Sequence, residues 1–205
     1  MLSFEQRFAR LVTTVVVRVP ALWPILRGPL RKNFDRLAPE WDASRVDDRR
    51  LAAMAAALDA IAEAPARVLD LGTGTGGVAR RASARWPEAQ VTGADVSTGM
   101  VAEARRLATS ERQRYEVADA SALPFDAGAF DLVTLSNMIP FFDELTRVTA
   151  PGGHVAIAYT RGPQTPIWVP LERVRAELER RGFAHVANFE ANGGLSLLAR
   201  KGDLS

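Results

Sequence analysis

Short apolar runs alternate with stretches of helical periodicity through most of the chain. A helix pattern precedes the first run, with Leu51, Met54 and Leu58 at helical spacing. Helices are expected at 42–64, 77–86, 98–108, 141–149 and 168–181. Strands are expected at 67–71, 89–95, 114–118, 130–136 and 154–159. Because strands and helices alternate, we predict a parallel sheet that carries helices on both faces.

The C-terminal part of the chain departs from this alternation. Two strand-like runs at 183–190 and 195–200 are joined by Ala191 to Gly194, a short loop of Asn and Gly that favours a β-hairpin. The hairpin makes one strand antiparallel. The pattern therefore predicts an α/β fold with a mostly parallel sheet and an antiparallel C-terminal hairpin.

A glycine-rich loop follows the first strand. Val68 to Gly77 reads VLDLGTGTGG, an apolar strand that runs into an acid and then a loop with alternate glycines. Glycine lacks a Cβ and tolerates positive φ, so such a loop turns tightly and lets a ligand approach the backbone. Two later strands also end in acids, Asp95 and Asp119. Because ligands of open α/β sheets bind at the carboxyl ends of the strands, these residues predict a nucleotide-type cofactor site.

The glycine spacing by itself fits two kinds of site. Three of the loop glycines match the G-x-G-x-x-G pattern of dinucleotide-binding units, and Asp95 lies where such units place a ribose-binding acid. Asp70, however, would repel a pyrophosphate and can reach a cationic group. Asp119 adds a third acid at the same edge, and dinucleotide domains do not usually end in a hairpin. These features favour a cofactor that carries a positive charge.

Five motifs occur in order along the chain and carry a family resemblance. They are Val68 to Gly76, Gly93 to Ser97 (GADVS), Asp119 with Leu123 to Phe125 (LPF), Phe130 to Val133 (FDLV) and Glu144 to Gly153 (ELTRVTAPGG). Together they resemble a class I S-adenosylmethionine-dependent methyltransferase, similar to the ubiquinone/menaquinone biosynthesis C-methyltransferases. The segment Phe34 to Asp42 (FDRLAPEWD) is similar to the opening segment of that group, which usually ends in Tyr-Asp. The resemblance covers residues 34 to 200.

The resemblance implies a Rossmann-like, doubly wound sheet of seven strands, with the last strand inserted between the fifth and the sixth. It implies S-adenosylmethionine as cofactor, with Asp70 attracting the ammonium group. Asp95 would accept both ribose hydroxyls, because a carboxylate can accept two hydrogen bonds at once. Asp119 and the Ala120 N–H would bind the adenine. The implied cofactor-binding residues are Asp70, Gly72, Gly74, Gly76, Asp95, Val96, Met100, Asp119, Ala120, Asn137 and Trp41.

The acceptor side of the site is less defined. Asn137, Tyr159 and Arg161 follow strand ends, and with Trp168 they are the residues expected to line an acceptor pocket. After Asn137, the loop and helix that usually complete this pocket in the family are shorter by about two helical turns. The pocket is then either more open or completed by the N-terminal segment or the loop around Trp168. Neither histidine is expected at this edge, and the sequence indicates no catalytic base, which the reaction needs only if the acceptor must lose a proton.

The first residues of the chain carry their charge unevenly. From Arg7 to Lys32 there are six basic residues and no acid, interleaved with apolar side chains. Arg18 interrupts the apolar run and the prolines at 20, 24 and 29 should break its helix, so no membrane span is expected. The segment is also a poor signal peptide. Residues 1–41 are then either a helical lid on the cofactor cleft or an interfacial segment that contacts a membrane through residues 7–32.

Composition argues for a single domain and against a metal site or a nucleic-acid partner. A chain of 205 residues fits one core, so residues 42–205 are expected to form a single S-adenosylmethionine-binding methyltransferase domain. The absence of cysteine and the two distant histidines argue against a metal site. A net charge of +2, with no basic stripe across the domain, argues against a nucleic-acid partner. We expect a cytoplasmic protein.

The leading hypothesis is methyl transfer from S-adenosylmethionine to a small, lipophilic or aromatic acceptor. The lipophilic part rests on the N-terminal segment and Trp168. Two alternatives stay open: an NAD(P)-dependent oxidoreductase, and a non-catalytic S-adenosylmethionine-binding protein that acts through partners. The oxidoreductase is opposed by Asp70 and Asp119, and by the lack of an obvious Tyr/Lys or Cys/His catalytic pair.

Overall fold

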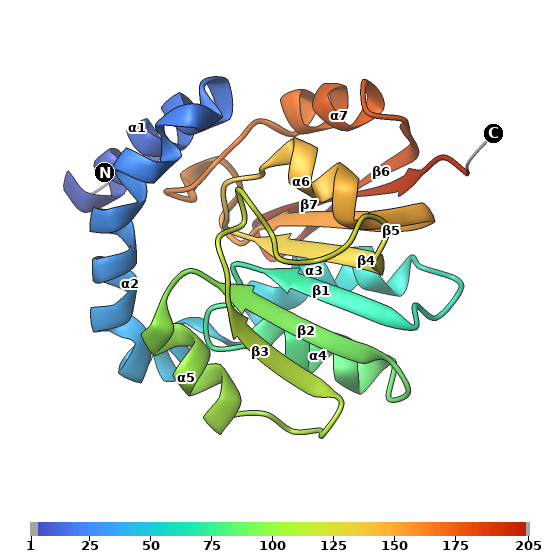
Figure 1. The fold of residues 1–205 in the computed structure, drawn as a ribbon, viewed down its shortest axis with the longest axis horizontal. Helices are drawn as coiled ribbons and strands as arrows, with labels where there is room; N and C mark the ends of the chain where they lie inside the picture. The colour runs from blue at the N-terminus through green and yellow to red at the C-terminus, as the bar shows by residue number, and fades with distance from the viewer. Residues whose placement is uncertain (1–3, 204–205) are drawn as a thin grey trace.

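The protein is built on one sheet of seven strands, seen in a computed structural model that describes residues 4–203 (Figure 1). The strand order is β3-β2-β1-β4-β5-β7-β6. Strands β1 to β5 pair in parallel, and β7 pairs antiparallel with both of its neighbours. The strands are β1 Arg67–Leu71, β2 Gln90–Asp95, β3 Gln113–Val117, β4 Phe130–Ser136, β5 Thr149–Tyr159, β6 Phe183–Ala191 and β7 Gly194–Lys201. The predicted fold class is confirmed, including the insertion of the last strand between the fifth and the sixth.

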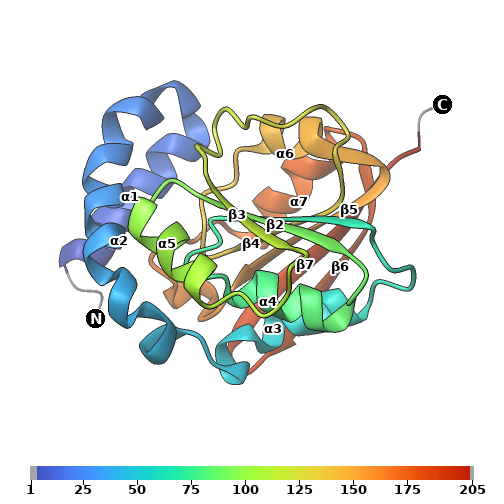
Figure 2. The same ribbon diagram turned by 60° about the horizontal axis from the view of Figure 1, so that its bottom comes forward.

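Helices cover both faces of the sheet (Figure 2). Helices α3 to α5 contribute to the apolar cluster on one face, and α6 and α7 contribute to the cluster on the other. Their bounds are α3 Asp48–Asp59, α4 Gly77–Arg85, α5 Thr98–Arg106, α6 Phe142–Val148 and α7 Leu171–Glu179, with the short helix η2 at Gly162–Gln164. Because both faces are covered, the central strands read as continuous apolar runs in the sequence.

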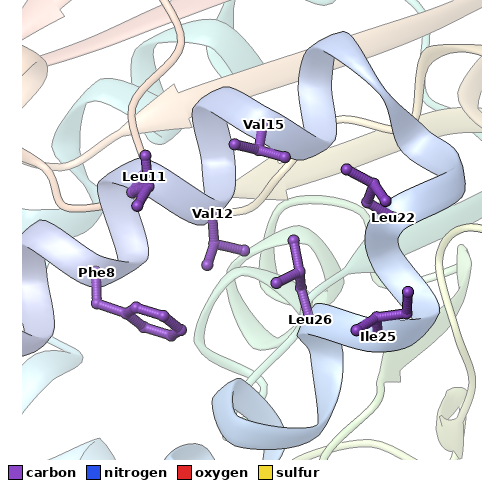
Figure 3. A pocket seen from close by; sticks show the side chains of 7 residues that line it. All are labelled: Phe8, Leu11, Val12, Val15, Leu22, Ile25 and Leu26. Carbon is purple, nitrogen blue, oxygen red and sulfur yellow. The ribbon is translucent and has the colours of Figure 1, made fainter.

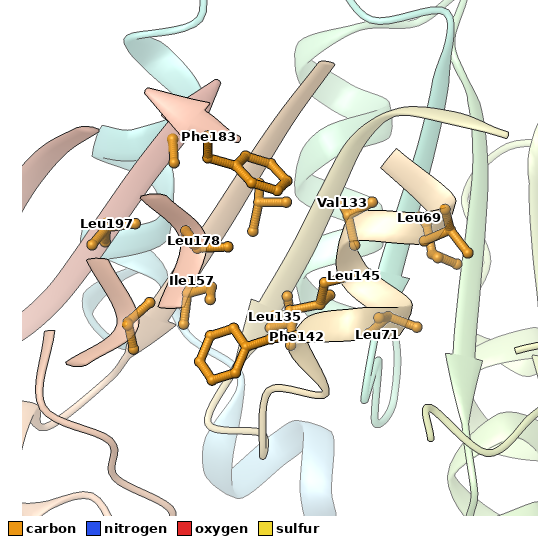
Figure 4. Close-up of a cluster of buried hydrophobic side chains, with 14 of the residues drawn as sticks. Leu69, Leu71, Val133, Leu135, Phe142, Leu145, Ile157, Leu178, Phe183 and Leu197 are labelled. Atoms are coloured by element: carbon orange, nitrogen blue, oxygen red, sulfur yellow. The ribbon is translucent and has the colours of Figure 1, made fainter. Parts of the chain in front are cut away.

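The larger core cluster lies between the sheet and helices α6 and α7 (Figure 4). Leu135 and Ile157 of the central strands are fully buried there, as are Leu145 of α6 and Leu178 of α7. Alternate strand residues, such as Val68 and Leu132, point into the second cluster, beneath α3 and α4. This alternation fixes the register of the sheet, since a shift by one residue would exchange the two clusters.

The N-terminal part of the chain forms a helical hairpin beside the sheet: α1 Phe4–Arg18, the short helix η1 Pro20–Leu22, and α2 Trp23–Arg45 (Figures 1 and 2). The expected helix breaks are only partly right. Pro20 lies in η1 and Pro24 in the first turn of α2, but Pro29 and Pro39 lie inside α2. Both are exposed, so the backbone groups that they leave without partners can reach water. No helix of residues 4–203 is long and apolar enough to cross a bilayer.

Three predicted boundaries are wrong. The single helix expected at 42–64 is divided, because Asp47 caps a new helix by accepting a 2.8 Å hydrogen bond from the Arg50 N–H, and α3 ends at Asp59. The helix expected from Trp168 begins at Leu171, after Pro170. Strand β5 begins at Thr149 and continues through the expected Pro-Gly-Gly turn, which forms a register shift against β4.

Candidate active site

The glycine loop lies between the end of β1 and the start of α4. Gly72, Gly74 and Gly76 all have positive φ, at 62°, 54° and 86°. At Gly76 any side chain would be strained, because a Cβ there would lie 2.8 Å from the Tyr115 hydroxyl oxygen and the backbone has a positive φ. The loop therefore presents bare backbone at the carboxyl edge of the sheet.

Asp70, the acid at the end of β1, is buried beneath this loop. Its side chain is 1 % exposed and accepts hydrogen bonds from the hydroxyls of Thr73 (2.7 Å) and Thr134 (2.8 Å). Burial raises the pKa of Asp70 to about 6, although both hydroxyls favour the charged form. No positively charged side chain of residues 4–203 donates a hydrogen bond to Asp70.

Asp95, at the end of β2, joins the glycine loop to the next helix. One oxygen accepts the Gly74 N–H and the other accepts the Ser97 N–H, both at 2.9 Å. Ser97 in turn caps α5 by accepting from the Met100 N–H. Burial raises the pKa of Asp95, against the effect of these two backbone hydrogen bonds. Each oxygen therefore has one backbone partner and further acceptor capacity.

Asp119 follows β3 and is held by donors from the N-terminal hairpin. The Trp23 indole N–H donates to Oδ1 at 2.8 Å, and the Arg27 guanidinium forms an ion pair with Oδ2. Ser121 donates to Oδ1 through its N–H and its hydroxyl. Burial alone would raise the pKa of Asp119, but these hydrogen bonds outweigh it and lower the pKa.

The second half of α2 is anchored to the same edge through its own acids. Asp35 accepts from the Ser97 hydroxyl (2.6 Å) and the Gly99 N–H (3.1 Å), and the Ser97 hydrogen bond lowers its pKa. Asp42 accepts from the Thr75 hydroxyl (2.8 Å) and from Arg80 (2.6 Å). Helix α2 therefore runs over the ends of β1, β2 and β3.

The predicted residues on the adenine side gather around a pocket. Val96 and Asp119 line a hollow of about 380 Å³ that α2 closes from above. The other lining residues are Pro24, Ile25, Arg27, Gly28, Arg31, Val117 and Ala118. Met100 lies behind this site in the core, 1 % exposed, and Ala120 packs against the apolar cluster of the N-terminal hairpin.

On the methionine side, the hairpin and the loop after β4 cover the glycines. A Cβ at Gly74 would lie 3.6 Å from the Trp41 indole nitrogen, which places the predicted Trp41 directly over the loop. Gly72 lies against Met138 in the same way. Asn137 adopts a positive φ of 53°, and its side-chain oxygen accepts the Thr160 N–H at 2.9 Å.

The residues predicted for the acceptor pocket do not form one surface. Tyr159 is fully buried in the core, where its ring meets Trp168 edge to face at 4.8 Å between centroids. Arg161 lies next to Gln164 on η2, with its guanidinium 3.5 Å from the Gln164 side-chain oxygen. Both histidines lie away from the site: His154 is at the middle of β5, where it pairs with Leu132 near the start of β4, and His185 is near the start of β6.

Sequence reasoning missed several residues that shape the site. Trp23 and Arg27 reach Asp119 across more than ninety residues of sequence, and no local pattern announces this contact. Thr134 was missed for the same reason. Asp35 and Asp42 could have been found from the sequence, because both belong to the segment Phe34 to Asp42 that is similar to the opening segment of the family.

The arrangement can bind one kind of ligand. Three carboxylates lie at the ends of adjacent strands, around a backbone loop and beside a partly apolar pocket. Carboxylates accept hydrogen bonds and attract cations, so the edge fits a ligand with a positive charge and several donor groups. It offers hydrogen-bond acceptors for an ammonium group, a vicinal diol and an amino-substituted ring.

Comparison with known proteins agrees with a site of this kind. Residues 68–153 match the model of a family described as a methyltransferase domain. A malonyl-[acyl-carrier protein] O-methyltransferase of Geobacter sulfurreducens is 33 % identical over 195 residues, which cover 80 % of this chain and 73 % of that protein. A demethylmenaquinone methyltransferase of Thermus thermophilus is 45 % identical over 107 residues, which span about half of each protein (48 % and 49 %).

Solved structures share the fold. Phosphoethanolamine N-methyltransferase 2 of Haemonchus contortus, solved with S-adenosyl-L-methionine, matches with a TM-score of 0.66 and 21 % identity over 84 % of this chain and 60 % of that one. The [4+2]-cyclase SpnF matches with a TM-score of 0.67 and 19 % identity over 85 % and 96 %. One fold thus carries more than one reaction, and it is the sequence relationship that establishes the family. The chain belongs to the class I S-adenosylmethionine-dependent methyltransferases.

Proposed function

We propose that this protein transfers a methyl group from S-adenosylmethionine to a small, lipophilic or aromatic acceptor. The observation that carries the proposal is the set of acids at the ends of β1, β2 and β3 around the glycine loop. When bound, the cofactor supplies an electrophilic methyl group on a sulfonium. The chain's own residues then have to hold the cofactor, orient the acceptor and exclude water.

The roles of the acids follow from their surroundings. Asp95 would accept the ribose hydroxyls, since each of its oxygens has one backbone hydrogen bond and can accept another. Asp70 would attract the ammonium group, because no cationic side chain of residues 4–203 donates to its buried carboxylate. Asp119 would accept the adenine amino group beside Val96, in the pocket that both residues line. Trp41 would cover the methionine part from its place over Gly74.

The apolar character of the acceptor is supported by what surrounds the loop after β4. Ile139 and Phe141 are buried in an apolar cluster with Trp23 of the N-terminal hairpin, and Met138 packs against it. We take these side chains as the apolar walls that an acceptor placed beside this loop would meet. Among the relatives, one is named for a quinone and another for a malonyl-carrier substrate. The apolar walls favour the quinone-like acceptor.

The outer face of the hairpin supports peripheral contact with a membrane, where such an acceptor would reside. Figure 3 shows an apolar groove of about 200 Å³ between α1 and α2. Leu11 (61 % exposed) and Ile25 (76 % exposed) belong to this face. Besides Arg27, which pairs with Asp119, four of the six basic residues of this segment are exposed, with no acid between Arg7 and Lys32, and these suit an anionic lipid surface: Arg7, Arg18, Arg31 and Lys32.

The cofactor assignment is tested by thermal unfolding with S-adenosylhomocysteine, S-adenosylmethionine, NAD and NADP. At about 100 times its Kd, a specific ligand adds about 2.7 kcal/mol. For a chain of this size the Tm rises by about 5–10 °C. A rise with the adenosyl ligands alone supports the proposal, and an equal rise with NAD refutes it. Release of S-adenosylhomocysteine is then compared between a demethylmenaquinone-type naphthol and a malonyl thioester, and turnover of the thioester alone would refute the lipophilic acceptor.

Membrane contact is tested by sedimentation with phosphatidylcholine vesicles, with and without phosphatidylglycerol. The wild type should sediment with the anionic vesicles, and the double variant Leu11→Gln/Ile25→Gln should not. Val117→Gln is the matched control, because Val117 is also exposed (50 %) but lies on β3. Equal sedimentation of all three proteins, or of none, would refute contact through the hairpin.

A further inference from the structure

The two carboxylate oxygens of Asp119 are occupied by the chain itself. Oδ1 accepts from the Trp23 indole N–H and twice from Ser121, and Oδ2 accepts from Arg27. Asp95 differs, because its partners are backbone N–H groups of the loop that it shapes. An adenine amino group that approaches Asp119 therefore meets side-chain donors from α2 already in place.

The two halves of α2 hold the domain in different ways. The N-terminal end of α2, residues 23–27 and here called its first turn, supplies Trp23 and Arg27 as hydrogen-bond donors to Asp119. The second half uses its own acids, Asp35 and Asp42, which accept from groups of the surrounding loops and helices. Only the first turn competes for an acceptor that the proposed cofactor needs.

A weak point separates these two halves. Gly28 and Pro29 follow Arg27 directly within α2. Proline removes one hydrogen bond of the helix and commonly marks a kink, and glycine has a poor helix propensity. A Cβ placed on Gly28 would meet no atom within 4 Å, so the space beside this position is open. The helix can therefore bend here while its second half stays anchored.

We infer that residues 4–27 form a latched lid on the adenine end of the cofactor site: Trp23 and Arg27 hold Asp119 when the cofactor is absent and leave it when adenine binds. The inference rests on the proposed function, because it takes Asp119 as the adenine acceptor. The lid bends at Gly28 and Pro29. Its closed form also keeps water and solutes out of the apolar cluster around Phe141, which Trp23 meets edge to face at 5.4 Å.

The latch lowers the apparent affinity for the cofactor, because only the open fraction binds. The ion pair itself contributes modestly, because the Arg27 side chain is 44 % exposed and solvent screens the pair. The lid is also held by the buried side chains of Val12 and Val16 and by Arg10, which donates to the carbonyls of Pro163 and Thr165. Removal of either donor should therefore raise the affinity for S-adenosylhomocysteine by about 3- to 10-fold. Adenosine should gain by the same factor, since the competition concerns the adenine alone.

Isothermal titration of S-adenosylhomocysteine and adenosine into the full chain tests the lid. The latch variants are Arg27→Ala and Trp23→Phe, which keeps an aromatic ring against Phe141. Lys32→Gln is the control, because it removes one positive charge from α2 and leaves Trp23, Arg27 and Ser121, the hydrogen-bond donors to Asp119, unchanged. Both latch variants should bind more tightly than the wild type, while the control should match it. Unchanged or weaker binding in both latch variants would overturn the lid.

Hydrogen exchange of the wild type gives a second readout that needs no variant. On addition of S-adenosylhomocysteine, amides at 20–27 should exchange faster and those at 35–45 should not. Protection of 20–27 by the ligand would show that the latch stays closed on the cofactor, and would overturn the inference. Asp119→Ala separates the two proposals, because it removes the latch and the acceptor together, whereas Arg27→Ala removes a latch donor alone: if Asp119→Ala binds as tightly as Arg27→Ala, the adenine role of Asp119 fails. If no protein binds the ligand, the proposed function itself fails.

Discussion

The buried carboxylate of Asp70 can be used to test whether the site contains a charge that destabilises the folded protein. Its carboxylate is 1 % exposed and has only the hydroxyls of Thr73 and Thr134 as side-chain partners. Replacing it by Asn keeps the shape and the acceptor oxygen but removes the charge. Asp70→Asn should therefore raise the free energy of unfolding at pH 8, unlike most substitutions of buried polar residues.

The magnitude follows from the pKa of Asp70. This pKa lies at about 6 in the folded chain, against an ordinary value of 3.8 for an aspartate side chain. A pKa raised by folding means that the folded state binds the proton more tightly. Its contribution to stability is then fully present below pH 3.8 and is lost as the pH rises through 6. The loss amounts to at most about 3 kcal/mol, so the advantage of Asp70→Asn should grow by up to that amount between pH 4 and pH 8.

The assay is urea unfolding of both proteins at several pH values, and the quantity of interest is the difference between their free energies of unfolding. The difference removes the contributions of groups that both proteins share, such as His154. Burial and Arg200 lower the pKa of His154, so its contribution to stability changes with pH in the opposite sense to that of Asp70. Asp48→Asn is the control, since it makes the same substitution at a carboxylate that is 96 % exposed. A difference for Asp70→Asn that is flat from pH 4 to pH 8 would refute the reasoning.

Other substitutions test the glycine loop and the helical hairpin. Gly76→Ala should lower the free energy of unfolding by about 1–3 kcal/mol in urea titration, because of its positive φ and its contact with Tyr115; an unchanged midpoint would contradict this. Tyr115→Phe should leave stability unchanged or raise it by up to about 1 kcal/mol, since the buried hydroxyl has no hydrogen-bond partner. In a double variant it should also recover part of the loss in Gly76→Ala. Gly28→Ala should stabilise the chain by about 0.5–1 kcal/mol and raise the Tm by about 2–4 °C, and a lower Tm would show that the position needs glycine.

The sequence predicted the sheet well because its elements are local and strongly patterned. The apolar runs of β1 and β4 are buried on both faces, and such runs can be recognised without knowledge of their partners. The positions of Asp95 and Asp119 at strand ends followed from the same runs. The order of the seven strands came from the family resemblance, since periodicity does not report which strands pair.

The N-terminal helical hairpin was harder to predict than the sheet, because its structure depends on contacts between residues that are distant in sequence. Helix α2 continues through Pro29 and Pro39, which a local rule assigns to helix breaks. Its path is set by the anchors of Asp35 and Asp42 on the sheet edge, and propensity gives no information about these. Tyr159 was expected near the acceptor because it ends β5, but the sequence could not show that its side chain points into the core.

The position of β7 has a consequence for how the chain reaches this structure. Strand β6 pairs only with β7, and β7 is the strand that joins it to β5. The two form a hairpin with a tight connection, so they can assemble locally before they meet the rest of the sheet. Until that hairpin docks, β5 keeps one edge unpaired, and unpaired edges invite association between chains. Completion of the sheet is then a late, non-local step, and aggregation during refolding should depend on how quickly β7 reaches β5.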